Sequence, residues 1–180
     1  EKKFTWVQPE NQKPLKSEPK NTLSKIGAPS PRGNHSATFI PQQNKVFVFG
    51  GHGGVGYSRK AFNDIYTYDL ATEFWTPLQP TGTPPRERGG HVACLLPKSQ
   101  KIFIYGGWNS VTQFENQFIY DAEKDEWIDL DANSHDLPRW CHSSIIVPAL
   151  PHNLLFVFGG SSDTFEEGTK RIFASLQNDI

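Results

Sequence analysis

The 180-residue sequence has no methionine, only two cysteines and no excess of charge of either sign. A formal net charge of -1 gives no overall field that would hold nucleic acid, so we expect no DNA or RNA partner. No apolar stretch approaches the roughly 18 residues of a membrane helix, and the segment after Glu1 has no signal-peptide core. These absences predict a cytoplasmic chain without membrane insertion. Because methionine is missing even at the first position, we expect the chain to be a segment of a longer protein.

The chain does contain one pattern three times, in which an Arg-x-x-His motif precedes an apolar run that ends in two glycines. The repeated residues are Arg32, Arg88 and Arg139, the histidines His35, His91 and His142, and the glycines Gly50, Gly51, Gly106, Gly107, Gly159 and Gly160. The histidines are 56 and then 51 residues apart. Such a period among strand-like runs is typical of a radially repeated sheet.

Each repeat predicts a four-stranded antiparallel meander. First strands are expected at 36–40, 91–96 and 143–147, and β-branched and aromatic second strands at 45–49, 101–105 and 154–158. Third strands at 64–69 and 117–121 carry the Tyr-Asp tyrosines Tyr68 and Tyr120, and Trp75 and Trp127 mark the fourth strands. The third repeat is predicted to break off at 176–180, where its third strand should begin.

These landmarks resemble the kelch repeat: an Arg near a Pro, Gly-Gly after the second strand, Tyr-Asp on the third and Trp on the fourth. The resemblance implies an all-β kelch-type β-propeller, of which about two and a half four-stranded antiparallel blades of a larger ring are present. We expect an outer strand (3–7) and a basic Pro- and Lys-containing loop in 1–26, kelch blades at 27–80 and 81–133, and an incomplete blade at 134–180. The remaining blades would come from the parent chain or from another polypeptide, because exposed strand edges need cover.

We find no catalytic or cofactor-binding motif whose surrounding residues support that function. The glycines of 51–56 satisfy G-x-G-x-x-G, yet no amphipathic helix follows to bind a pyrophosphate. The three repeated histidines are carried around a propeller axis, so we expect structural roles and no metal site. Cys94 and Cys141 occupy different repeat positions and are expected to be reduced, packed thiols. We therefore predict no cofactor and no catalysis; the alternative is part of a kelch-fold enzyme, a metal-dependent oxidase or sugar isomerase, whose catalytic residues lie outside this segment.

The predicted function is a protein-protein interaction scaffold that binds partners through loops on one face. The connections between second and third strands, and those leading to the next first strand, emerge on the same side. The candidate contact residues on that side are Tyr57, Arg59, Lys60, Trp108, Asn109, Phe114, Trp140, Phe165, Arg32, Arg86 and Arg88. Arginine and aromatic residues together predict acidic peptide segments as partner. The kelch resemblance implies a cytoskeletal or axonemal complex as a further possible partner, and hence a cytoskeletal or ciliary setting. The alternative is that the repeated arginines bind their own loops.

Overall fold

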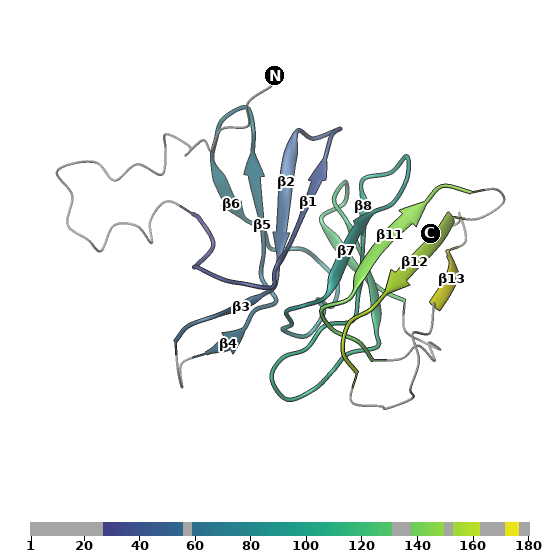
Figure 1. The fold of residues 1–180 in the computed structure, drawn as a ribbon. Coiled ribbons are helices and arrows are strands. Elements are labelled where there is room, and N and C mark those ends of the chain that lie inside the picture. Colours follow the sequence, from purple (N-terminus) through teal and green to yellow (C-terminus); the bar gives the residue numbers. More distant parts are fainter. Residues whose placement is uncertain (1–26, 56–58, 131–137, 150–152, 163–171, 177–180) are drawn as a thin grey trace, which may run out of the picture.

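The computed structural model describes residues 27–55, 59–130, 138–149 and 153–162, together with the backbone of 172–176. The all-β prediction is confirmed, because every regular element in these ranges is a strand. Among the described residues there is accordingly no helix long and apolar enough to cross a membrane. The main sheets follow one another along the chain (Figure 1).

Two of the sheets have four strands each, joined in the predicted meander. The first contains β1 (Ser36–Ile40), β2 (Lys45–Phe49), β5 (Ile65–Asp69) and β6 (Trp75–Pro77). The second contains β7 (Val92–Leu95), β8 (Lys101–Tyr105), β9 (Gln117–Asp121) and β10 (Glu126–Asp129). In both sheets each strand pairs antiparallel with the next strand of the same sheet. A small hairpin of β3 (His52–Gly53) and β4 (Lys60–Ala61), which the sequence did not predict, extends the connection from β2 to β5.

The third sheet contains β11 (Ser143–Val147), β12 (Asn153–Phe158) and β13 (Ile172–Leu176). The prediction that its third strand begins at 176 was wrong, because β13 ends there and pairs antiparallel with the whole of β12 except Phe158. The apolar run Ile-Phe-Ala-Ser-Leu supplies this strand. The predicted outer strand (3–7) and basic loop lie outside the described residues.

The sheets pack face to face, with their first strands adjacent: β1 contacts β7, and β7 contacts β11. One apolar core joins the first two sheets and includes Phe47, Phe49, Ile104 and Trp127. A second core joins the second and third sheets around Phe103, Tyr105, Leu155 and Val157. Each sheet therefore contributes one face to each neighbouring core, as expected for propeller blades.

The Tyr-Asp pairs end the third strands by capping the following turn. Asp69 Oδ1 accepts hydrogen bonds from the backbone N–H groups of Ala71 and Thr72, at 2.9 and 3.1 Å. Asp121 caps its own turn in the same way. The tyrosine ring packs against the tryptophan of the fourth strand, with centroids 5.0 Å apart in both Tyr68–Trp75 and Tyr120–Trp127.

Candidate functional site

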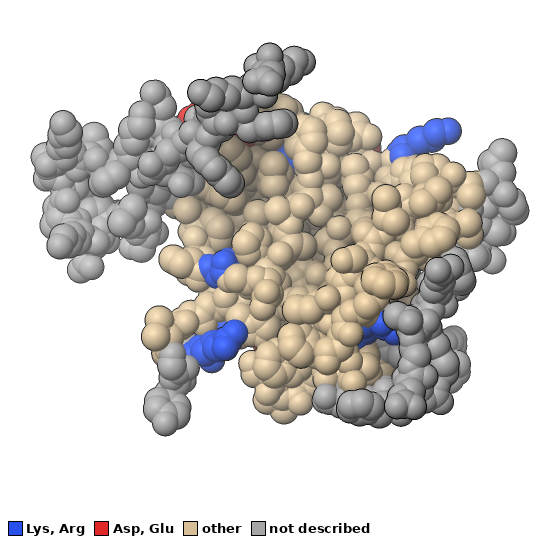
Figure 2. Space-filling model, in the orientation of Figure 1, with Lys and Arg blue, Asp and Glu red and all other residues tan. Residues whose placement is uncertain are grey.

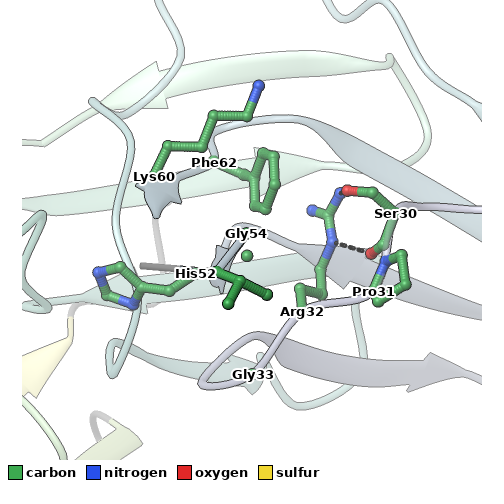
Figure 3. A pocket seen from close by; sticks show the side chains of 10 residues that line it. Ser30, Pro31, Arg32, Gly33, His52, Gly54, Lys60 and Phe62 are labelled. Carbon is green, nitrogen blue, oxygen red and sulfur yellow. Dashed lines mark hydrogen bonds between the residues drawn. The ribbon is translucent and has the colours of Figure 1, made fainter. Parts of the chain in front are cut away.

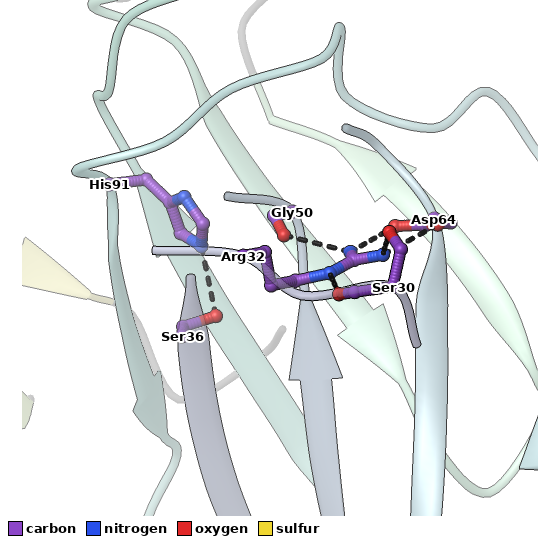
Figure 4. Close-up of polar contacts among 6 residues, drawn as sticks. All are labelled: Ser30, Arg32, Ser36, Gly50, Asp64 and His91. Atoms are coloured by element: carbon purple, nitrogen blue, oxygen red, sulfur yellow. Dashed lines mark hydrogen bonds and ion pairs between the residues drawn. The ribbon is translucent and has the colours of Figure 1, made fainter. Parts of the chain in front are cut away.

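The repeated Arg32 binds the loop of its own blade (Figure 4). Its Nη1 donates to the carbonyl of Gly50 at 2.9 Å, and its Nη2 donates to Asp64 Oδ2 at 3.1 Å. The guanidinium also lies 4.2 Å from the centroid of the Phe62 ring. Only 4% of the Arg32 side chain is exposed, so its hydrogen-bonding capacity is directed inward.

Arg88 repeats this arrangement in the second blade. It donates to the carbonyl of Gly106 and to Asn116 Oδ1, both at 2.9 Å, and stacks 4.3 Å from the Phe114 ring centroid. Arg88 and Phe114 are 0% and 5% exposed. In the third blade Arg139 donates to the carbonyl of Gly159.

The interpretation of Arg32, Arg88 and Phe114 as partner contacts is therefore corrected, because Arg88 and Phe114 are buried and the guanidinium of Arg32 is bound by groups of its own blade. They hold the connection between the second and third strands against the glycine pair, which was the alternative left open by the sequence. The sequence contained a signal that was missed: an aromatic ring and an acceptor two residues later recur, as Phe62 with Asp64 and as Phe114 with Asn116.

Two of the repeated histidines fill the junctions between blades. The His91 ring meets Phe49 edge-on at 5.2 Å, and His91 Nε2 lies 2.8 Å from Ser36 Oγ. His142 meets Tyr105 at 5.1 Å. Burial, with the charge of Arg88 next, lowers the pKa of His91 to about 3; burial and Arg139 lower the pKa of His142 to about 4. Both rings are therefore neutral near pH 7.

No three His, Cys, Asp or Glu side chains among the described residues are grouped so that they could hold a metal ion. His52 is a third buried histidine, from the glycine-rich segment considered as a nucleotide motif. Burial and the positive charge of Arg59 lower its pKa. The sequence did not mark His52 as part of the site.

A row of aromatic rings crosses the three blades on the predicted side, which we call the loop face. His52 and Trp108 lie 5.6 Å apart, and Trp108 stacks on Trp140 with centroids 5.2 Å apart and ring planes at 27°. The backbones of Trp108 and Gly89 exchange two hydrogen bonds of 2.9 Å. Trp140 and Ser161 are joined in the same way, at 3.1 and 2.9 Å.

These backbone pairs align the repeats and show that neither tryptophan is required by the fold. Trp108 occupies the position of His52 and Ser161, whereas Trp140 occupies that of Gly33 and Gly89. Both tryptophans are half-buried. A stacked, partly exposed ring pair that the repeat does not require is the arrangement expected of an interaction site.

Two exposed cationic side chains, Arg59 and Lys60, lie near His52 at one end of the row. Arg86 is also exposed. An open pocket of about 610 Å³ is lined by Lys60, with His52 at one end and Arg32 at the other (Figure 3). None of its lining residues is acidic, and the Lys60 ammonium lies 5.3 Å from the ring centroid of Phe62 in its wall.

Of the other predicted contacts, Asn109 is a loop cap: its Oδ1 accepts from the N–H groups of Val111 and Thr112 at 3.1 and 2.8 Å. Tyr57 and Phe165 lie outside the described residues. The loop face thus brings together Arg59, Lys60, Trp108 and Trp140 from three separate segments, with Arg86 exposed on the connection into the second blade.

Comparison with known proteins gives a family match over most of the chain. A family model described as the KLHDC2/KLHL20/DRC7 Kelch-repeats domain matches residues 3–174. The chain is 39% identical over 90 residues to a Rab9 effector protein with kelch motifs of Xenopus laevis, covering 50% of this chain and 24% of that protein.

Two further relatives are named as an enzyme and as a dynein chain. An N-(sulfonatooxy)prop-2-enimidothioate sulfolyase of Thlaspi arvense is 30% identical over 139 residues, which cover 74% of this chain and 37% of that protein. A dynein heavy chain-like protein 2 of Plasmodium falciparum is 29% identical over 129 residues, covering 71% and 2%. The chain thus spans well under half the length of each of these three relatives.

Proposed function

Because this chain belongs to the kelch-repeat family, we propose that it is a non-catalytic interaction module that binds a segment of a partner protein across the loop face. The observation that carries the proposal is the stack of Trp108 on Trp140. Two half-buried rings from different blades form one continuous apolar surface at positions where the other repeats have smaller residues or histidine.

The chemistry around the stack favours an acidic partner segment that also carries an apolar or aromatic side chain. Arg59 and Lys60 would approach carboxylates, while the tryptophan pair would receive the apolar group. A flexible acidic segment would be attracted by these charges and fixed by the rings. We expect binding to weaken with salt, since the cations are exposed.

The setting that we propose is the cytoplasm, in a cytoskeletal or ciliary assembly, which the resemblance to a dynein-named chain supports. The sulfolyase relative supports an alternative in which the parent protein is an enzyme. Metal content and lyase activity of the parent protein would distinguish the alternatives, because the interaction module requires neither.

The test uses substitutions that the repeats themselves supply. Trp108→Ser places the residue of position 161 in the second blade, and Trp140→Gly places the residue of positions 33 and 89 in the third. Immobilised chain is offered a library of displayed peptides, and we expect selection of acidic sequences that contain an aromatic residue. The double variant should lose at least tenfold in affinity for the selected peptides and keep its thermal unfolding temperature.

The matched control is Phe74→Ala, because Phe74 is 57% exposed and lies in the turn before β6 instead of on the loop face. It should leave peptide affinity unchanged. Equal affinity of the double variant and the unmodified chain would remove the loop face as the binding site.

A further inference from the structure

Ser30 occupies a repeat position whose backbone is used by the fold and whose side chain is not. Its carbonyl accepts a hydrogen bond from Arg32 Nε at 3.1 Å, and in the second blade the carbonyl of Arg86 accepts from Arg88 Nε at 3.0 Å. Both Ser30 and Arg86 are exposed. The first blade therefore presents a hydroxyl group where the second blade presents a guanidinium.

The Ser30 hydroxyl lies among cationic groups. Ser30 lines the open pocket together with Arg32 and Lys60 (Figure 3), and its Oγ accepts a hydrogen bond from Arg32 Nη2 at 3.2 Å (Figure 4). The guanidinium and the Lys60 ammonium lie 4.2 and 5.3 Å from the centroid of the same ring, that of Phe62. A group added to Ser30 Oγ would thus be placed in a pocket with cations in its wall.

The charges around this pocket favour an anion. Asp64 shares Arg32 Nη2, at 3.1 Å, and so compensates the charge of that guanidinium, whereas Lys60 adds a second cation to a lining that has no acidic side chain. Figure 2 shows Lys and Arg side chains over the region of the β3–β4 hairpin, with no Asp or Glu side chain beside them on the face in view. An anionic group on Ser30 would therefore be stabilised by Lys60 and would in turn cancel its charge.

Ser30 also has the sequence context of a substrate for a proline-directed protein kinase. Three Ser or Thr residues of the chain precede a proline: Ser30, Thr76 and Thr83. Thr76 lies within β6, where it is paired with Thr67, whereas Ser30 and Thr83 are exposed and lie outside the strands. The following proline favours extended backbone at Ser30, so its hydroxyl can enter a kinase site without separation of paired strands. Of the three, only Ser30 lines the pocket.

We propose that Ser30 is a phosphorylation site, and that its phosphate lowers the affinity of the loop face for acidic segments. A proline-directed kinase supplies the group from ATP. The bond between Ser30 Oγ and the γ-phosphorus forms, the bond from that phosphorus to the β,γ-bridging oxygen breaks, ADP leaves, and the hydroxyl proton passes to the catalytic aspartate of the kinase.

The effect on affinity follows from charge and position. A phosphoserine carries about -1.5 to -2 charges at pH 7, more than the single positive charge of Lys60. It would neutralise this cation and repel the carboxylates of an approaching segment, while the stack of Trp108 on Trp140 stays intact. This effect rests on the proposed function, because it requires that an acidic segment approaches Lys60.

The first experiment tests the modification without any partner. The complete 180-residue chain is incubated with ATP and a proline-directed serine/threonine kinase, and the phosphate is mapped by mass spectrometry. We expect phosphate on Ser30, and its loss from that peptide in Ser30→Ala with phosphorylation of Thr83 unaltered. No phosphate on Ser30 from a kinase that modifies a free Ser-Pro peptide would overturn the proposal.

The second experiment measures the affinity of the selected acidic peptides for a chain with phosphoserine installed at position 30. We expect affinity to fall about tenfold at low ionic strength and less at high salt, because exposed charges are screened. The matched control Phe74→phosphoserine places the same charge in the turn before β6 and should leave affinity nearly unchanged. Ser30→Arg, which supplies the residue of position 86, should bind at least as tightly as the unmodified chain.

The outcomes separate this inference from the proposed function. Equal affinity of the phosphorylated and unmodified chains, or an equal loss in the Phe74 control, would overturn the effect of the Ser30 phosphate and leave the loop face as the binding site. An unmodified chain that binds no acidic peptide would overturn the proposed function together with this effect, while the phosphorylation itself is decided by the first experiment.

Discussion

The junction between the first two sheets and the outer face of the third sheet are built from the same repeat positions, yet only the junction is closed. Phe49 is covered by His91 and Trp127, while Phe158 is 63% exposed. The difference shows that one blade supplies only one of the two faces that form each core. Its second-strand aromatic residues become a stable interior when the next Arg-x-x-His segment covers them.

The largest expected effect is the unequal cost of truncating equivalent phenylalanines. Phe49→Ala should lower the free energy of unfolding by about 3 to 5 kcal/mol, because it empties a filled core position. Phe158→Ala should cost less than about 1 kcal/mol, because 63% of the residue is already exposed. Chemical denaturation of both variants makes the comparison, and equal losses would contradict the blade alignment.

The first glycines of the second and third Gly-Gly pairs provide a second comparison. Gly106 and Gly159 have nearly the same φ, 71° and 70°, so alanine should cost each about 1 to 2 kcal/mol through backbone strain. At Gly106 the added Cβ also collides with the Arg139 carbonyl and the His142 ring, which should raise the total to about 2 to 4 kcal/mol. Chemical denaturation of the two variants gives both values. If alanine lowered the free energy of unfolding less at Gly106 than at Gly159, the junction would accommodate the added methyl group and the expected collision would be wrong.

The buried histidines make the closed junctions sensitive to acid. His91 and His142 have folded-state pKa values of about 3 and 4, below the ordinary 6.5, so the unfolded chain binds protons first as the pH falls. Their stabilisation is complete above pH 6.5 and is lost below it, by up to about 1.4 kcal/mol per pH unit for each ring. Denaturation between pH 7 and 5 avoids the range in which most carboxylates titrate.

The control for this pH dependence is His142→Phe. Both His142 ring nitrogens are buried without a hydrogen-bond partner among the described residues, so a phenyl ring can replace the imidazole on Tyr105. The variant should lose roughly a third to a half of the slope between pH 6.5 and 5, because His91 and His52, whose pKa values are also lowered, still contribute. An unchanged slope would assign the acid sensitivity to other groups.

The strands could be predicted from the sequence because strand patterns and turn residues are local. Repeated apolar runs, Gly-Gly and Tyr-Asp located the first three strands of the two four-stranded sheets, and β11 and β12, to within a residue or two, but not β3, β4 or β13. The roles of Arg32 and Arg88 could not be predicted from the Arg-x-x-His motif, because it does not tell whether a guanidinium points outward. Their partners Asp64 and Asn116 lie 32 and 28 residues further along the chain.

The site was predicted only in part, because it depends on contacts between repeats. Trp108 and Trp140 were both expected on the loop face, but their stacking follows from the alignment of different loops in neighbouring blades. His52 was not predicted as a site residue, because its glycine-rich segment was considered only as a nucleotide-binding motif. Residues that differ from their equivalents in the other repeats, once the repeats are aligned by their backbone pairs, would have indicated all three.

The smallest effect concerns the inner backbone of the junction, where one position is left-handed in every blade. Asn34, Gly90 and Cys141 have φ of 56°, 67° and 53°. Cysteine is the least suited to this conformation, so Cys141→Gly should stabilise the chain by about 0.5 kcal/mol, the strain relieved exceeding the entropy cost of glycine. The converse Gly90→Ala should destabilise it, because its Cβ would press on Cys141 Sγ at 3.1 Å. Thermal unfolding measures both, and since Cys141 is exposed, a loss of stability in Cys141→Gly would show that its side chain holds the junction instead of straining it.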